Sequence, residues 1–498
     1  MPDYYYTKND DILNSSLNKR FQDIHFMTNS EFEKWIKSFA RLVKKIWDEK
    51  GIPFVAGKTE EEITNDFKRM LNLDPTSQLV RDTATLQEDC IKNSIKINVA
   101  DAFFPNILKA KDTIGKKQYS VYDLFTPDPA CYELLYKTLH KALRKDSMRG
   151  FSKLDKSKGA KNITEKQIIP YLKAIEKTGG SYWFEANPKL LSAARVGREL
   201  IEKLIAEKKI DKKHEVDLRK NRLEVHHHYY IRKMGDEKVF PNIVTIVKTG
   251  KISAPTNFQP VVAKYIYKRY TDLLRKQEQI VIYDPSMGFG GRLLGALALG
   301  DRRIHYVGTD PNTENWISEI DRSRYKVLEQ TFNSRVSREK PFTGEYICCG
   351  SEDISSQKMF KKYKGKLDLV FTSPPYFSAE IYSDEETQSF IRYKTYDDWR
   401  DNYWAKTIRT CVTYLKPKRY MIFNIADVEL NGRQLPLEED TIEIAKSLNM
   451  KYRKRLKMVV SSAPGAGRKK GGNLTTMNFC EVNGALRKYE PILVFYKP

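Results

Sequence analysis

Apolar residues follow two different patterns along the chain. In the second half they form short continuous runs, which are typical of strands buried on both faces of a parallel sheet. The runs that we interpret as strands lie at residues 279–283, 304–310, 346–353, 367–372, 420–425 and 490–496. Helical spacing of apolar residues occurs between them, at 261–270, 293–299 and 399–414. Because strands and helices alternate, this half of the chain predicts an α/β fold.

The first half has apolar residues at intervals of three and four, which predicts a mainly helical structure. The predicted helices are residues 31–47, 60–71, 130–143, 165–176 and 186–206. A stretch rich in Lys, Ser and Gly at 147–162 is typical of a linker. We therefore expect a mainly helical domain at 1–150, a basic helical and hairpin region at 151–245, and an α/β domain at 246–498.

Composition narrows the class of protein. Apolar residues make up 40% of the 498 residues, which is ordinary for a globular protein. No apolar run is long enough to cross a membrane, and Met-Pro-Asp-Tyr at the start does not begin a signal peptide. The six cysteines lack the spacing of zinc ligands, so we expect no metal. This cysteine usage favours a reducing, cytoplasmic setting.

The apolar run at 367–372 ends abruptly at Ser373-Pro374-Pro375-Tyr376. In open α/β sheets, ligands bind at the carboxyl ends of the strands, where this tetrapeptide falls. Proline has a fixed φ and no N–H, so the carbonyl groups beside the two prolines point in fixed directions. The Ser373 hydroxyl adds an acceptor, and Tyr376 offers a flat ring for stacking. We therefore interpret the tetrapeptide as a clamp for a planar heterocycle that carries an amino group.

A second candidate binding turn follows the run at 279–283. Asp284-Pro285 is followed by Gly288 and Gly290, which allow a sharp turn and a close approach of a ligand to the backbone. The third glycine of the dinucleotide fingerprint GxGxxG is missing, so the spacing does not fit that fingerprint.

Two acidic residues follow the next two strands. Asp310 ends the second strand, where it is placed to accept hydrogen bonds from ribose hydroxyl groups. Asp353 ends the third predicted strand and could face an adenine amino group. Either residue alone would more often be a helix N-cap. In this order, after a glycine-rich turn and with strands between them, they are a far more specific signal of a binding site.

The two turns, taken in order, resemble those of the DNA amino-methyltransferases. In that family a Ser/Asp/Asn-Pro-Pro-Tyr motif holds an exocyclic amine, and an Asp-Pro-x-x-Gly-x-Gly motif binds S-adenosylmethionine (AdoMet). The resemblance covers about residues 250–498, half of the chain. It implies a Rossmann-like, AdoMet-dependent methyltransferase sheet there, with residues 284–290 at the cofactor and Ser373-Pro374-Pro375-Tyr376 at the target base.

The same resemblance extends to residues 254–260, which look like the family's motif X. It implies that Phe258 lies against the methionine end of AdoMet. The alternative is a helix-capping loop with Phe258 in the core.

The identity of the target base rests on the first residue of the clamp. By resemblance, Ser-Pro-Pro-Tyr favours cytosine N4 over adenine N6, although some adenine enzymes carry it. RNA is less favoured, because RNA amino-methyltransferases more often have Asn or Asp at this position. The chain has no Pro-Cys dipeptide, which disfavours cytosine-C5 chemistry through an attacking thiolate. The expected reaction is direct transfer to the amine of a flipped nucleotide.

Charge supports a nucleic-acid substrate. The net charge is +23, and residues 137–220 alone contain 22 basic and 11 acidic side chains. Such stripes neutralise phosphates, although a charge run is more often only a solvated face. Arg468-Lys469-Lys470 lies in a stretch rich in Ser, Gly and Ala at 461–475, which we interpret as a DNA-contacting loop. Expected partners are double-stranded DNA and, for a paired enzyme, a cognate restriction endonuclease; no membrane partner is expected.

A run of three histidines offers a hypothesis of a different class. His226-His227-His228 followed by Asn242 resembles the opening of an HNH nuclease hairpin, with His227 as base, His226 as metal ligand and Asn242 as the orienting residue. The later metal-binding histidine of that family is missing, since no His lies between His228 and His305. The alternatives are a strand with exposed histidines and a degenerate, nuclease-derived DNA-binding module. A vestigial methyltransferase fold that only binds DNA is a third hypothesis.

Overall fold

A computed structural model gives the fold of the chain. It describes residues 10–25, 27–52, 59–92, 97, 99–114, 117–143, 161–162, 165–166, 194–195, 203–209, 236–250, 257–317, 322–335, 340–378, 381–430, 432–462 and 478–498. The chain divides into two compact units, one of Met1–Tyr5, Phe54–Ser120 and Ala254–Pro498, the other of Tyr6–Pro53 and Val121–Ser253. This division differs from the expected domains 1–150, 151–245 and 246–498, because residues 54–120 pack with the C-terminal half.

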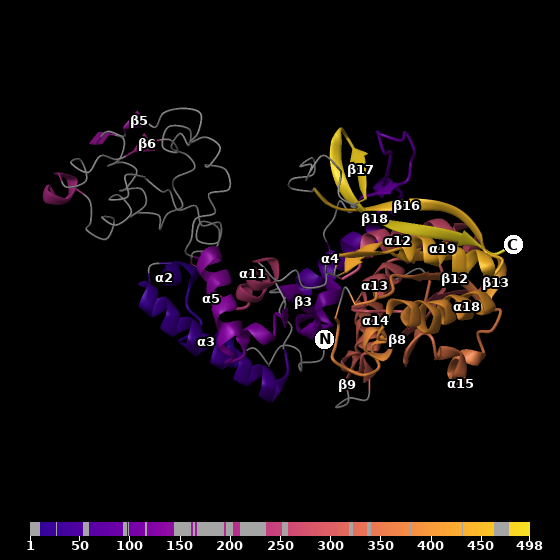
Figure 1. Cartoon of the computed structure of the whole chain (residues 1–498), viewed down its shortest axis with the longest axis horizontal. Helices are drawn as coiled ribbons and strands as arrows, with labels where there is room; N and C mark the ends of the chain where they lie inside the picture. The colour runs from indigo at the N-terminus through magenta and orange to yellow at the C-terminus, as the bar shows by residue number, and fades with distance from the viewer. Residues whose placement is uncertain are drawn as a thin grey trace. The chain divides into compact units, whose positions relative to one another are not determined.

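Among the described residues, the first unit contains a ten-stranded sheet in the order β1-β2-β16-β18-β13-β12-β7-β8-β11, with β17 paired to β18 (Figure 1). The strands are β1 (Leu79–Val80), β2 (Cys90–Ile91), β7 (Ile280–Asp284), β8 (Ile304–Asp310), β11 (Phe342–Cys348), β12 (Leu367–Thr372), β13 (Leu415–Asn424), β16 (Lys451–Ser462), β17 (Phe479–Val482) and β18 (Ala485–Tyr496). Strands β11, β8, β7, β12 and β13 are parallel, and β18 is antiparallel to both of its long neighbours. The predicted α/β class with a Rossmann-like sheet is confirmed, and each of the six predicted runs overlaps a strand, although the run at 346–353 shares only residues 346–348 with β11.

The strand order reverses between β7 and β12. From β7 the chain continues outward through β8 to β11, then returns to place β12 on the other side of β7. The two strands pair in parallel, with Leu369 opposite Ile282 and Val370 opposite Tyr283. Their carboxyl ends therefore meet at one edge of the sheet. Such a topological switch point is where open α/β sheets bind ligands.

Helices cover both faces of the central strands, which explains why β7 and β12 are buried at every position. On one face lie α12 (Pro260–Thr271), α13 (Gly291–Leu297) and α14 (Arg324–Arg335). There the ring of Tyr267 meets the rings of Phe371 and Tyr306 edge-on. On the other face α18 (Ala405–Tyr414) and α19 (Leu437–Ser447) pack with Tyr283 and Val370 in one core cluster.

Residues from the N-terminal half complete the first unit. Helix α4 (Glu60–Asn72) lies against α14, where the rings of Phe67 and Phe332 stack with centroids 4.1 Å apart. Farther along, the buried ring of Phe104 packs against Tyr325 at 4.9 Å. This segment therefore closes the same face of the sheet that α12, α13 and α14 cover.

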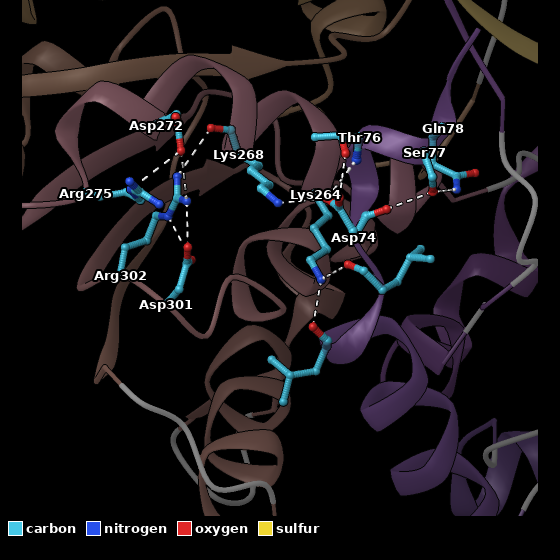
Figure 2. A network of polar contacts seen from close by, with 12 residues as sticks. Asp74, Thr76, Ser77, Gln78, Lys264, Lys268, Asp272, Arg275, Asp301 and Arg302 are labelled. Carbon is cyan, nitrogen blue, oxygen red and sulfur yellow. Dashed lines mark hydrogen bonds and ion pairs between the residues drawn. The ribbon is translucent and has the colours of Figure 1, made fainter.

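A buried lysine holds the end of α4 (Figure 2). The Nζ atom of Lys264 donates to the carbonyl oxygens of Met70, Leu71 and Leu73 at 2.7, 2.8 and 2.6 Å. The last carbonyl groups of an α-helix have no hydrogen-bond donor within the helix, and the Lys264 ammonium group supplies one here. Burial lowers the pKa of Lys264 to about 8. Beside it, Lys268 pairs with Asp74 at 2.7 Å.

The short strand β2 extends the sheet by pairing in parallel with β16. Lys457 on β16 bonds Asp82 at 2.6 Å and Asp89 at 2.9 Å. Ligand atoms of Asp82, Asp89 and Cys90 lie within 4.8 Å of one another, as in a metal site. The Lys457 ammonium group already supplies the cation that these carboxylates need.

The described part of the second unit is mainly helical, apart from the paired two-residue strands β5 (Lys161–Asn162) and β6 (Ala194–Arg195). It contains α3 (Asn29–Lys50), which begins with a capping box on Thr28, and α5 (Pro129–Leu143), which contacts α3. The helices predicted at 31–47, 60–71 and 130–143 are confirmed, whereas those at 165–176 and 186–206 lie mostly outside the described residues. Within the described part of the chain, no helix has both the length and the apolar character that crossing a membrane requires.

Candidate active site

A pocket opens at the switch point, with about 1190 Å³ of empty space including its open mouth. The turns after β7, β8, β11 and β12 line it, together with residues 257–259 and 387–389. The predicted site residues that line it are Phe258, Pro285, Gly288, Asp310, Ser373, Pro375 and Tyr376. The two turns that we singled out in the sequence therefore face one cavity.

Asp284 lies beneath the pocket and does not line it. Its buried carboxylate accepts hydrogen bonds from Arg292 Nε at 2.9 Å, Tyr306 Oη at 2.6 Å and Thr372 Oγ1 at 2.7 Å. These donors come from α13, β8 and β12, so one carboxylate ties together the three elements around the turn. We assign Asp284 the task of shaping the site from below.

The two glycines of the turn have left-handed backbone angles, with φ of 55° at Gly288 and 75° at Gly290. Gly288 lines the pocket, and an added Cβ there would meet no atom within 4 Å. Gly290 is the N-cap of α13 and faces the protein interior, where an added Cβ would lie 2.6 Å from Phe104 Cε2. Only Gly288 thus presents its backbone to a ligand, whereas Gly290 allows the close packing of Phe104.

Asp310 stands at the end of β8, at the wall of the pocket. Its carboxylate accepts the backbone N–H of Gly288 at 2.8 Å and that of Asn312 at 3.0 Å. Burial raises its pKa to about 7, and these two hydrogen bonds oppose the rise. Asp310 therefore fixes the glycine turn and is also placed to accept hydrogen bonds from a ligand.

Glu352, and not Asp353, faces the pocket. Asp353 is absent from the pocket lining, and its half-exposed carboxylate pairs with Arg392. The adjacent Glu352 lines the pocket; its Oε1 accepts from Arg392 Nη1 at 2.9 Å, and its buried Oε2 has no hydrogen-bond partner among the described residues. Burial raises the pKa of the Glu352 carboxyl group. Glu352 therefore stands at the position in the pocket wall that we expected for Asp353.

The clamp forms the opposite wall. Ser373, Pro375 and Tyr376 line the pocket, whereas Pro374 is buried and does not. The Ser373 hydroxyl donates to Oδ1 of Asn424 at 3.1 Å, and the Tyr376 hydroxyl donates to the Asn424 backbone oxygen at 3.4 Å. Asn424 at the end of β13 thus supports both polar members of the clamp.

Phe258 lies between the two halves of the site. Its ring meets Phe371 edge-on with centroids 5.5 Å apart, and the guanidinium group of Arg292 lies 5.5 Å from its centre. Phe258 thus packs against the core and also lines the pocket, and its contact with the methionine end of AdoMet stays a prediction.

Sequence reasoning missed a third wall, which comes from the segment after the clamp. Tyr382, Thr387, Gln388 and Ser389 line the pocket. Glu385 binds this segment to the turn after β8, because its carboxylate accepts from Thr313 N at 3.0 Å and Thr313 Oγ1 at 2.7 Å. The polar residues just beyond the clamp could have suggested a binding segment. Whether their side chains face the pocket, however, depends on this long-range contact.

Tyr403 was also missed. It lies in the π-helical turn Trp399–Trp404 that precedes α18, lines the pocket and shares a hydrogen bond of 3.3 Å with Ser286. Single π-helical turns occur often at functional sites because they redirect a side chain. No feature of the sequence marked this turn.

The structure does not place Asn242 as the nuclease hypothesis requires. Asn242 is the first residue of helix α11 (Asn242–Gly250), and its side chain donates to Glu237 at 3.4 Å. A helix at this point is incompatible with the second strand of the resembled hairpin. His226, His227 and His228 lie outside the described residues, and so do Arg468, Lys469 and Lys470.

Comparison with known proteins found similarities of fold alone. No protein-family model matches the chain, and the search of curated proteins found no match. Among solved structures, the chain is similar to a candidate DNA modification methylase from Thermus thermophilus, with 18% identity and a TM-score of 0.21 over 30% of this chain and 51% of that one. Another structure of that methylase, complexed with AdoMet, aligns at 19% identity over 30% of this chain and 53% of that one, with a TM-score of 0.21.

A candidate RNA methyltransferase from Pyrococcus horikoshii aligns at 13% identity over 49% of this chain and 86% of that one, with a TM-score of 0.27. TrmN from Thermus thermophilus aligns at 11% identity over 48% of this chain and 49% of that one, with a TM-score of 0.26. The chain thus spans about half the length of the methylase from Thermus and of TrmN. At these TM-scores, substrate and chemistry have to be argued from the residues of the pocket.

Proposed function

We propose that this protein is an AdoMet-dependent DNA methyltransferase that acts on the exocyclic amine of a flipped base, with cytosine N4 as the favoured target. The observation that carries the proposal is the shared pocket. The glycine turn with its acidic neighbours and the Ser-Pro-Pro-Tyr clamp line one cavity at the switch point of one sheet. A methyl donor held by the first would lie next to an amine held by the second.

The cofactor half has free hydrogen-bonding capacity of the right kind. Asp310 offers a carboxylate to the ribose hydroxyl groups, and the unpartnered Oε2 of Glu352 can accept from the adenine amino group. Gln388 adds a donor, since its buried Nε2 also lacks a partner in the part of the chain that the structure describes. Buried polar atoms without partners are costly, so a ligand that pairs with both fits the site. AdoMet, when bound, would supply a methyl group on a positively charged sulfur.

The clamp half has the task of orienting the amine. Tyr376 would stack on the base, while the Ser373 hydroxyl oxygen would accept one of its amino hydrogens. We propose the Pro374 carbonyl group as the second acceptor, which requires the bound base to reach past the present lining of the pocket to this buried residue. These hydrogen bonds hold the nitrogen lone pair out of the ring and direct it toward the methyl group. Alignment of the two reacting atoms would supply much of the rate. The nitrogen gains a methyl group and loses one proton to water at the mouth of the pocket.

The choice of base rests on Ser373 and on the resemblance, so adenine N6 stays as the second target. Double-stranded DNA is the proposed partner, and a cognate restriction endonuclease is proposed if the enzyme is paired. We further propose that Arg468, Lys469 and Lys470 contact phosphates. Replacing all three by Ala should weaken DNA binding at every sequence and reduce the slope of log K against log salt by up to about three.

The decisive experiment incubates the protein with methyl-labelled AdoMet and DNA of mixed sequence, followed by mass spectrometry of the nucleosides. N4-methylcytosine is the expected product, and N6-methyladenine in its place would assign the second target. The Ser373→Ala variant should bind S-adenosylhomocysteine as the wild type does but lose most of the transfer. Binding of S-adenosylhomocysteine without any methylated nucleoside would contradict the proposal.

A further inference from the structure

Asn424 is a buried amide at the wall of the pocket. It is 1% exposed, ends β13 and lies next to the clamp, yet the mechanism above does not use it. Its Nδ2 donates to the backbone oxygen of Pro491 at 3.0 Å, and its Oδ1 accepts the Ser373 hydroxyl at 3.1 Å. Asn424 therefore links the clamp to the neighbouring strand β18.

The direction of these hydrogen bonds is dictated by Pro491. A backbone oxygen can only accept, so the amide must turn its nitrogen toward Pro491 and its oxygen toward Ser373. A flipped amide would place two acceptors against each other at one end. With Oδ1 facing it, the Ser373 hydroxyl donates its single proton to Asn424. What Ser373 then has left for the pocket is lone pairs alone.

We propose that Asn424 is a positioning residue that makes Ser373 a pure acceptor toward the target base. This role rests on the proposed function and deepens it. A base edge with an amino group donates to Ser373 and is held, whereas a keto edge brings a second acceptor and is rejected. Asn424 has no titratable proton, so it takes no part in removing the amine proton, which passes to water.

The Asn424 side chain can be removed without leaving the Pro491 oxygen unpaired. The backbone N–H of Ile425 also donates to that oxygen, at 3.3 Å. Asn424→Ala is therefore expected to fold. Its Ser373 hydroxyl would rotate freely and could turn its proton toward the base, which lowers the turnover rate rather than cofactor binding.

A double-mutant cycle tests the role. Methyl transfer to mixed-sequence DNA is measured for the wild type, Asn424→Ala, Ser373→Ala and the double variant. Asn424→Ala should reduce kcat by about 10- to 100-fold in the wild-type background, the cost of one misdirected hydrogen bond. In the Ser373→Ala background the same substitution should have no further effect on kcat, because the hydroxyl group that Asn424 orients is gone.

Asn333→Ala serves as a matched control. Asn333 also donates its amide to a backbone oxygen, that of Phe342 at 3.2 Å, but it does not line the pocket. Its substitution should leave kcat unchanged. Affinity for S-adenosylhomocysteine, measured by calorimetry, verifies that each variant is folded, and Asn424→Ser enters the same cycle if Asn424→Ala does not bind it.

The outcomes separate the two proposals. If the Asn424 substitution reduces kcat by the same factor with or without Ser373, or reduces it in neither background, the positioning role is wrong while the methyltransferase proposal stands. If the wild type binds S-adenosylhomocysteine and methylates no nucleic acid, the proposed function fails and the role fails with it.

Discussion

Burial controls the charge of the carboxylates that face the pocket. Asp310 and Glu352 both have pKa values raised mainly by desolvation, and Asp310 has a pKa of about 7. The backbone N–H groups of Gly288 and Asn312 favour the ionised form of Asp310 but do not cancel this effect. Near neutral pH, Asp310 therefore changes from a mixed donor and acceptor to an acceptor only, which matters for a ligand that brings hydroxyl groups.

This predicts pH-dependent cofactor affinity. If the ionised form of Asp310 binds the ribose, affinity for S-adenosylhomocysteine should rise about tenfold between pH 6 and 8, as the ionised fraction rises through the pKa. Titration calorimetry across that range measures it. In the Asp310→Asn variant the affinity should be lower and flat with pH; the same rise in that variant would assign the titration to another group.

The raised pKa of Asp310 also makes the stability of the fold depend on pH. Stability should fall as pH rises, whereas cofactor affinity should increase. A carboxyl group whose pKa is raised in the folded state stabilises that state below the unfolded pKa and loses this contribution as pH rises through about 7. The stability of Asp310→Asn relative to the wild type should therefore increase as pH rises from 4 to 8. Urea unfolding at several pH values measures the difference.

At the scale of elements, the turn from β7 to α13 is fixed from two sides. Asp284 ties it from below to α13, β8 and β12, and Phe104 from the N-terminal segment packs against Gly290. The turn thus depends on a residue far away in sequence for its shape. The two glycines of the turn therefore differ in the substitutions that they tolerate.

We expect the Gly290→Ala and Gly288→Ala variants to differ in stability. In both variants the left-handed backbone angle costs about 1–2 kcal/mol, but only the Cβ at Gly290 meets the Phe104 ring, which adds about 1–3 kcal/mol. Gly290→Ala should thus be the less stable in urea unfolding. Adding Phe104→Leu should recover part of the loss; equal stability of the two glycine variants would contradict the packing argument.

The C-terminal end of α4 gives a second prediction at this scale. Lys264→Met removes three hydrogen bonds to carbonyl groups and should lower the free energy of unfolding by about 1–3 kcal/mol. The pKa of Lys264 is lowered to about 8 in the folded state, so the unfolded chain binds more protons between pH 8 and 10.5. The wild type should gain stability relative to Lys264→Met across that window. Lys268→Met, which breaks a partly exposed pair with Asp74, is the control and should show little change.

At the scale of the whole molecule, the sheet unit is assembled from two distant parts of the chain. Residues 54–120 cover one face of the sheet, supply β1 and β2 at one end of it, and place Phe104 at the glycine turn. A piece of the chain limited to residues 254–498 would expose Phe332 and Tyr325, which are now buried.

That piece is therefore expected not to fold by itself. Expressed alone, residues 254–498 should lack a cooperative thermal transition and should not bind S-adenosylhomocysteine. Co-expression with residues 54–120 should restore both properties at least in part. Cooperative unfolding and binding by the isolated piece would show that the expected boundary at 246 is the functional one.

The sequence by itself determined the local features of the unit that contains the sheet. Strands buried on both faces have continuous apolar runs, so six strands could be located, and Pro and Gly mark where two of them end. The residues at those ends, including Gly288, Asp310, Ser373 and Tyr376, line the pocket. Such features depend on neighbours along the chain, which is why they can be read without a structure.

Tertiary structure alone decided which polar atoms face the ligand. Adjacent carboxylates cannot be ranked from sequence; Arg392 pairs with both Glu352 and Asp353, but of the two only Glu352 lines the pocket. The orientation of the Asn424 amide is set by Pro491, on another strand, and Gly290 packs against Phe104 from the N-terminal half. Each of these outcomes depends on a contact between residues far apart in sequence, and a hydrogen bond or a packed ring has a partner only once the sheet has brought the two together.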